Sequence, residues 1–164
     1  MTDAAQPDAY SRAGESEAER LDRNWNEILQ ELRVIQTGTQ ILTGFLLALA
    51  FQERFAELDS YQVTTYLVLV GMAAVATLLA LSPVSLHRAL FRQQAKQRLV
   101  RLANVLLKLT LGAVALTLTG TSMLIFDVVA GRTAGLIAAA AALGLAVLAW
   151  LVLPLAVQRR HRGA

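Results

Sequence analysis

The sequence predicts an all-α membrane protein with four transmembrane helices arranged as two hairpins. Hydrophobic residues make up 55% of the 164 residues, and the mean hydropathy of +0.50 is typical of membrane proteins. Four apolar stretches lie at about residues 34–51, 61–81, 102–126 and 133–157. Each is long enough to cross most of a hydrocarbon core at about 1.5 Å per helical residue. A basic stretch separates the first two from the last two.

This basic stretch, residues 82–101 (SPVSLHRALFRQQAKQRLVR), contains no acid. Short loops rich in Lys and Arg stay in the cytoplasm. The only basic residues in the turns near residues 52–60 and 127–132 are Arg54 and Arg132. We therefore expect a multi-pass protein of a bacterial plasma membrane with both termini in the cytoplasm. Ser82 and Pro83 predict the start of a new helix, so that the second and third spans are joined by a basic cytoplasmic helix. Anionic lipid headgroups are its expected partners.

The N-terminal part of the chain changes character near residue 19. Residues 1–18 contain few bulky apolar side chains, and we expect a disordered cytoplasmic tail there. From residue 19, apolar residues recur every three or four positions, which predicts an amphipathic helix continuous with the first span. The membrane domain then covers residues 19–157, and residues 158–164 form a basic cytoplasmic tail.

The composition excludes several classes of site. The chain has no Cys and only two His, so we expect no disulfide, metal site or cofactor. The bases lie at the ends of apolar stretches, where topology accounts for them, and we expect no nucleic-acid partner. No catalytic set of side chains and no glycine-rich phosphate loop is present, and we expect no enzyme.

Polar residues in the cytoplasmic third of two spans form a candidate intramembrane site. A charge at the depth of Lys108 costs at least about 2.5 kcal/mol unless it reaches the headgroups or finds a partner. Either Lys108 extends to the interface or pairs structurally, or it lines an ion path. The glutamines of the first span either hydrogen-bond neighbouring helices or line a pore. The candidate residues are Gln36, Gln40, Asn104 and Lys108.

Opposite charges are expected to meet below the membrane. Glu27 and Glu31 lie on the amphipathic helix, and Arg88 and Arg92 lie in the basic stretch. The two segments either dock through these charges or remain separately solvated, since exposed ion pairs contribute little.

Small residues on the fourth span recur at steps of four, in two rows. This spacing permits close helix packing, against either the same chain or a second copy. The residues are Gly135, Ala138, Ala139, Ala142 and Ala146.

The chain also resembles a family of uncharacterised, small, four-span actinobacterial membrane proteins. The resemblance covers about residues 24–131. It is carried by Gln30-Glu31-Leu32-Arg33, by residues 36–40, and by Pro83 with His87-Arg88 and Phe91-Arg92. Some members of that family carry a sodium/proton antiporter label. The resemblance implies a four-span fold without an established activity.

Two functions remain open on the sequence. The first is a structural or interaction protein that self-associates, because four short helices enclose little interior of their own. The second is an oligomeric ion channel or cation/proton transporter. A proton-coupled exchanger usually needs a titrating carboxylate in the membrane. Only Glu31, near the inner membrane surface, or Asp127, near the outer one, could serve as this carboxylate.

Overall fold

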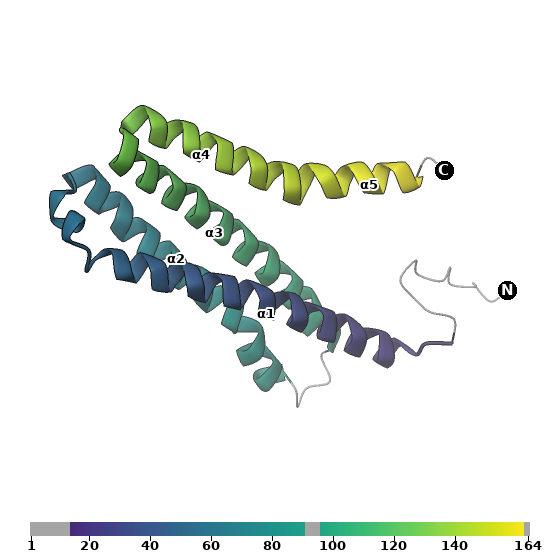
Figure 1. Cartoon of the computed structure of the whole chain (residues 1–164). Coiled ribbons are helices and arrows are strands. Elements are labelled where there is room, and N and C mark those ends of the chain that lie inside the picture. Colours follow the sequence, from purple (N-terminus) through teal and green to yellow (C-terminus); the bar gives the residue numbers. More distant parts are fainter. Residues whose placement is uncertain (1–13, 91–95, 163–164) are drawn as a thin grey trace.

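The computed structural model describes residues 14–90 and 96–162, and this part of the chain is almost entirely helical (Figure 1). Four helical segments are long and apolar enough to cross a membrane. The elements, in chain order, are α1 (Glu17–Leu49), η1 (Glu53–Glu57), α2 (Ser60–Leu90), α3 (Lys96–Ala130), α4 (Arg132–Val147), η3 (Leu148–Val152) and α5 (Leu153–Arg162).

Helix α1 begins earlier than expected. Ser16 and Glu19 form a capping box, in which the Glu19 N–H donates to Ser16 Oγ and the Ser16 N–H donates to Glu19 Oε2. This cap starts the helix at Glu17, two residues before the expected position. The helix then runs without a break to Leu49, so the N-terminal helical segment and the first span are one rod. Residues 1–13 of the expected tail lie outside the described residues.

Helix α2 continues through Pro83, so the prediction of a new helix starting at Ser82 is wrong. Ser82 Oγ does not cap a helix but donates to the carbonyl of Leu78 at 2.8 Å. Proline inside a helix removes one backbone donor, and neighbouring groups can compensate for it within a membrane bundle. The Pro83 side chain is fully buried, and tertiary packing therefore overrides the local signal for a helix start.

A single residue connects α3 to α4. Gly131 has φ of +88°, a conformation that L side chains rarely adopt. Its N–H donates to the Asp127 carbonyl at 2.9 Å, and its own carbonyl accepts from the Gly135 N–H at 3.1 Å. The chain thus reverses direction without an intervening loop.

The last span is one rod made of α4, η3 and α5, and we call it the α4–α5 arm. The turn at η3 is π-helical, and the Leu153 N–H donates to the carbonyl of Leu148. Pro154 follows directly. Its ring would clash with a carbonyl four residues earlier in a regular α-helix, and the widened turn gives it room.

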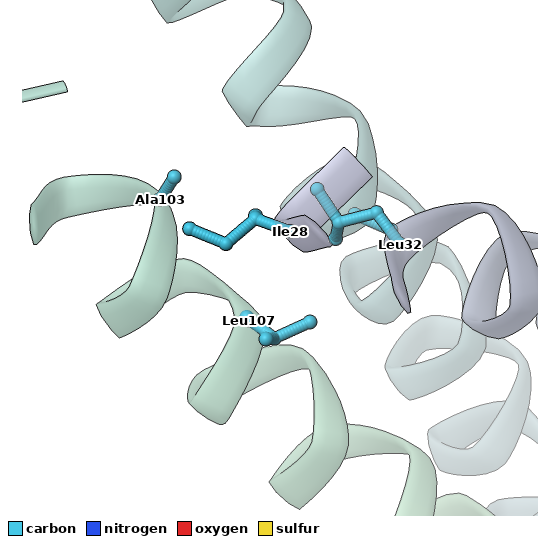
Figure 2. Close-up of a cluster of buried hydrophobic side chains, with 5 residues drawn as sticks. Ile28, Leu32, Ala103 and Leu107 are labelled. Atoms are coloured by element: carbon cyan, nitrogen blue, oxygen red, sulfur yellow. The ribbon is translucent and has the colours of Figure 1, made fainter. Parts of the chain in front are cut away.

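Helix α3 is central: it packs against α1, α2 and α4, while α1 also packs against α2. Two apolar clusters hold α1, α2 and α3 together. One, partly drawn in Figure 2, consists of Ile28, Leu32, Ala80, Ala103 and Leu107. The other consists of Leu46, Tyr66, Leu69, Ala73 and Leu124. We call the end of the bundle with η1 and Gly131 the turn end, and the opposite end the basic end.

The α4–α5 arm touches α3 near the turn end and diverges from it toward the C-terminus (Figure 1). Every side chain from residue 147 to residue 156 is exposed. The arm contains the most apolar of the four spans, so a long apolar surface is left uncovered.

Candidate functional site: a buried carboxylate at the turn end

The Gly131 turn positions the first two members of a polar cluster. Asp127 on the last turn of α3 is 5% exposed. Because the chain reverses at Gly131, Arg132 returns alongside it, and Arg132 Nε lies 3.3 Å from Asp127 Oδ1. A buried carboxylate is costly without a partner, and Arg132 supplies one.

The start of α2 brings the next two members. The Gln62 N–H donates to Asp59 Oδ1 at 2.8 Å, and the Asp59 N–H donates to Gln62 Oε1 at 3.1 Å. This reciprocal arrangement is a capping box, which fixes both side chains at the helix start. The free amide of Gln62 then donates to Asp127 Oδ2 at 3.4 Å, and Arg132 Nη2 lies 3.4 Å from Asp59 Oδ2.

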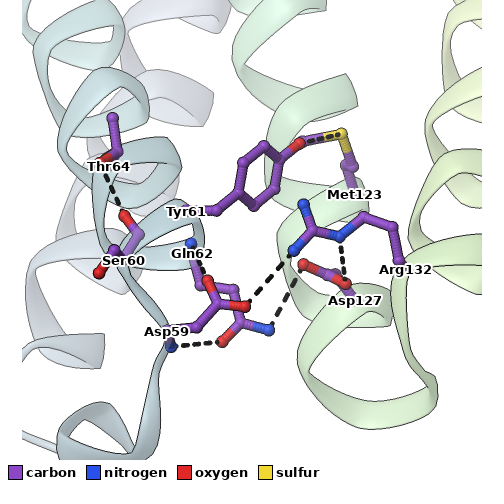
Figure 3. Close-up of polar contacts among 8 residues, drawn as sticks. All are labelled: Asp59, Ser60, Tyr61, Gln62, Thr64, Met123, Asp127 and Arg132. Atoms are coloured by element: carbon purple, nitrogen blue, oxygen red, sulfur yellow. Dashed lines mark hydrogen bonds and ion pairs between the residues drawn. The ribbon is translucent and has the colours of Figure 1, made fainter.

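Tyr61 completes the cluster. The Arg132 guanidinium lies 3.6 Å from the centroid of the Tyr61 ring, a cation–π arrangement. The Tyr61 hydroxyl faces Met123 Sδ at 3.9 Å. Figure 3 shows Arg132 between the two carboxylates, with contributions from α2, α3 and α4. We call Asp59, Tyr61, Gln62, Asp127 and Arg132 the turn-end cluster.

Chemically, the turn-end cluster is an electrostatic clamp between the two halves of the chain. It contains two carboxylates and one guanidinium, so its formal charge is negative. The distances of 3.3 and 3.4 Å are longer than those of strong charge-assisted hydrogen bonds. Within residues 14–90 and 96–162, no group of three His, Cys, Asp or Glu side chains could hold a metal ion.

The four residues of the expected intramembrane site lie in four different places. Gln36 Nε2 donates to the carbonyl of Ala80 on α2 at 3.2 Å, while Gln40 is exposed. Asn104 lines a groove of about 280 Å³ between α1 and α3. Lys108 lines a separate groove between α2 and α3. Equal depth therefore does not bring these four side chains into one site.

Glu27 and Glu31 line the same α1–α3 groove as Asn104. Glu27 also pairs with Arg23 at 3.5 Å on its own helix. Arg92 lies outside the described residues, and of Arg88 only the helical backbone is described. Docking between these acids and the basic stretch stays a prediction.

The first residue of the small-residue row of α4, Gly135, packs against α3 of the same chain. Gly135 is buried, and a Cβ added there would lie 2.8 Å from the Met123 carbonyl oxygen and 2.9 Å from Asp127 Cβ. Ala138, Ala139, Ala142 and Ala146 are half-buried. Gly135 thus lets α4 approach α3 closely enough for Arg132 to reach Asp127.

Threonines supply most of the polar groups in the core. Thr39, Thr110 and Thr117 are buried, and each hydroxyl donates to the carbonyl four residues earlier in its own helix. Three other buried hydroxyl oxygens lack a hydrogen-bond partner among the described residues, and they belong to Thr43, Thr119 and Thr121.

The sequence singled out Asp127 only as an acid close to the membrane, and its partners were not predicted. Two local signals were available: the Asp59-x-x-Gln62 capping pattern and a Gly between Asp127 and Arg132. Neither signal shows that the two turns meet, because that depends on how α2 packs against α3.

Comparison with known proteins gives a family without an activity. Neither a curated protein nor a solved structure matches the chain. A family model described as a family of unknown function, DUF6328, matches residues 14–154. Since this match covers most of the chain, the protein belongs to the DUF6328 family of unknown function.

Proposed function

We propose that the protein is a non-enzymatic, multi-pass protein of the bacterial plasma membrane that works by associating with further copies of itself. Its four spans form two hairpins with both termini in the cytoplasm. The distribution of paired bases supports this orientation. At the turn end, Arg54 pairs with Glu57 and Arg132 pairs with Asp59 and Asp127. The bases at the other end are in excess over acids, as expected of a cytoplasmic side.

The α4–α5 arm is the observation that carries self-association. It leaves α3 uncovered near the basic end, where Leu102 and Val105 are exposed, and it exposes its own side chains from residue 147 to residue 156. The two uncovered surfaces belong to one chain. A second copy related by a two-fold axis can therefore place its arm against them and receive the first arm in return.

Cysteine cross-linking in native membranes tests this proposal, because the chain has no Cys of its own. Leu151→Cys places a thiol on the arm, where the native side chain is 58% exposed, and Val105→Cys places one on the uncovered part of α3, where it is 51% exposed. Co-expression of these two single variants followed by oxidation should yield a disulfide-linked dimer, and co-expression of Leu151→Cys with Ile41→Cys, on α1 and 70% exposed, should yield much less. Equal cross-linking of the two combinations, or a monomeric mass in mild detergent, would contradict self-association through the arm.

The second candidate is an oligomeric ion channel or cation/proton transporter. The unpartnered hydroxyls of Thr43, Thr119 and Thr121 favour it, because buried polar atoms of this kind are often satisfied by water or an ion. Cation flux into liposomes containing the purified protein tests this function. If Thr121→Val abolishes a flux that the wild type supports, ion transport replaces self-association as the proposed function. If no flux occurs in wild type, transport is eliminated.

A further inference from the structure

Lys108 lies in an open groove on the surface of the bundle. The groove has a volume of about 550 Å³ and runs between α2 and α3. Apart from Lys108, its lining is apolar or small, and includes Gly71, Met72, Val75, Gly112 and Leu116. It belongs neither to the turn-end cluster nor to the exposed surface of the α4–α5 arm.

Two glycines keep this groove open. A Cβ added at Gly71 or at Gly112 would have no heavy atom within 4 Å. Gly120 and Gly135 differ, because a Cβ there would collide with Leu69 and with the backbone of α3, respectively. Gly71 and Gly112 are therefore not needed for close packing between helices of this chain. They leave a trough whose walls are bare backbone and apolar side chains.

Lys108 brings a positive charge into this trough without a counter-charge. Among residues 14–90 and 96–162, no carboxylate forms an ion pair with it, and no acid lines the groove. A charged side chain within a span is stable only with a partner or with access to the interface. An anion at the headgroup level that also has an apolar part would complement both the charge and the apolar walls of the groove.

We infer that this groove binds an anionic phospholipid, with one acyl chain in the trough and the phosphate at the Lys108 ammonium. The groove supplies apolar walls for the chain, and a long Lys side chain extends along them toward the headgroups. In the orientation proposed above, this lipid belongs to the cytoplasmic leaflet, and that assignment rests on the proposed orientation. A helix of a second copy is the alternative occupant, because Glu31 lies beside Leu107 at a similar level of the bundle, and the experiment below distinguishes the two.

Native mass spectrometry of the full chain in mild detergent tests the site, with phosphatidylglycerol and phosphatidylcholine as probes. Lys108→Met removes the charge, and it should lower the preference for phosphatidylglycerol about fivefold, the effect of one basic side chain near a charged surface. Lys108→Arg should keep that preference. Gly112→Leu should reduce the binding of both lipids, because it fills the trough where the native fold leaves space.

Arg101→Met is the matched control, since it removes an exposed base from the same helix outside the groove. It should retain more of the phosphatidylglycerol preference than Lys108→Met does. Unchanged lipid binding in both Lys108→Met and Gly112→Leu would overturn the inference. So would a change in the mass of the assembly with Gly112→Leu while lipid binding stays the same, because the groove would then hold a second copy. Loss of self-association alone leaves the lipid site intact, so the two proposals fail separately.

Discussion

Arg132 lies over Tyr61, with its guanidinium 3.6 Å from the ring centroid. The two residues come from different helices, α4 and α2. The same guanidinium approaches Asp59 and Asp127, so one side chain joins α2, α3 and α4 at the turn end. The structural role of Arg132 is therefore greater than that of an ordinary loop arginine.

Replacing Arg132 should destabilise the protein, because it leaves the buried carboxylate of Asp127 without its charged partner. We expect Arg132→Met to lower the free energy of unfolding by about 1–3 kcal/mol, the typical cost of a buried polar group left without its partner. Thermal unfolding in detergent measures the change. Arg54→Met is the control, since Arg54 and Glu57 are both more than 70% exposed, and their pairing contributes little. Adding Asp127→Asn to Arg132→Met should recover part of the loss, and failure to do so would show that the cluster is not electrostatic.

Gly135 and Gly144 should respond in opposite directions to the same substitution. Gly135→Ala forces a Cβ to within 2.8 Å of the Met123 carbonyl oxygen, and overpacking of this kind costs about 1–3 kcal/mol. Gly144→Ala meets nothing within 4 Å and should stabilise helix α4 by about 0.5–1 kcal/mol. Unfolding in a graded detergent mixture compares the two. Equal effects would mean that α4 does not approach α3 at Gly135.

Gln36 and Gln40 form a second matched pair. Gln36→Leu removes the bond to the Ala80 carbonyl and should cost about 0.6–2 kcal/mol, the range for polar contacts between membrane helices. Gln40→Leu removes an exposed amide from the same helix and should leave stability unchanged or higher. Thermal unfolding of both variants measures the difference. A larger loss with Gln40→Leu would place the functional amide at position 40 instead.

Reporter fusions test the orientation of the chain. Fusions after Arg92 and Arg162 should report the cytoplasm, because bases are retained on that side. Fusions after Glu57 and Arg132 should report the outside. An external signal after Arg92 would invert the whole arrangement, including the leaflet assigned to the lipid at Lys108.

Hydropathy predicted four helices that are long and apolar enough to cross a membrane, because the length and apolarity of each segment are properties of the local sequence. Pro83 was misjudged for the opposite reason. Its local signal for a helix start is real, yet its ring is buried in the bundle and Gln36 from α1 binds a carbonyl near it. No local pattern contains that contact.

The candidate sites were harder to predict because depth does not determine rotation about a helix axis. The predicted site grouped four residues by depth, and they do not share one place. Gln36 contacts α2, Gln40 is exposed, and Asn104 and Lys108 line two separate grooves. The turn-end cluster depends on contacts between Asp59 and Arg132, which are far apart in the sequence. Only the packing of α2, α3 and α4 together brings them into range.

The single-residue turn at Gly131 has a consequence for biogenesis. With no loop between them, we expect α3 and α4 to enter the membrane as a helical pair. In the proposed orientation, Asp127 and Arg132 then cross it at the tip of that pair. Because they lie 3.3 Å apart there, they cross as a neutral unit, which lowers the cost of moving either charge through the hydrocarbon.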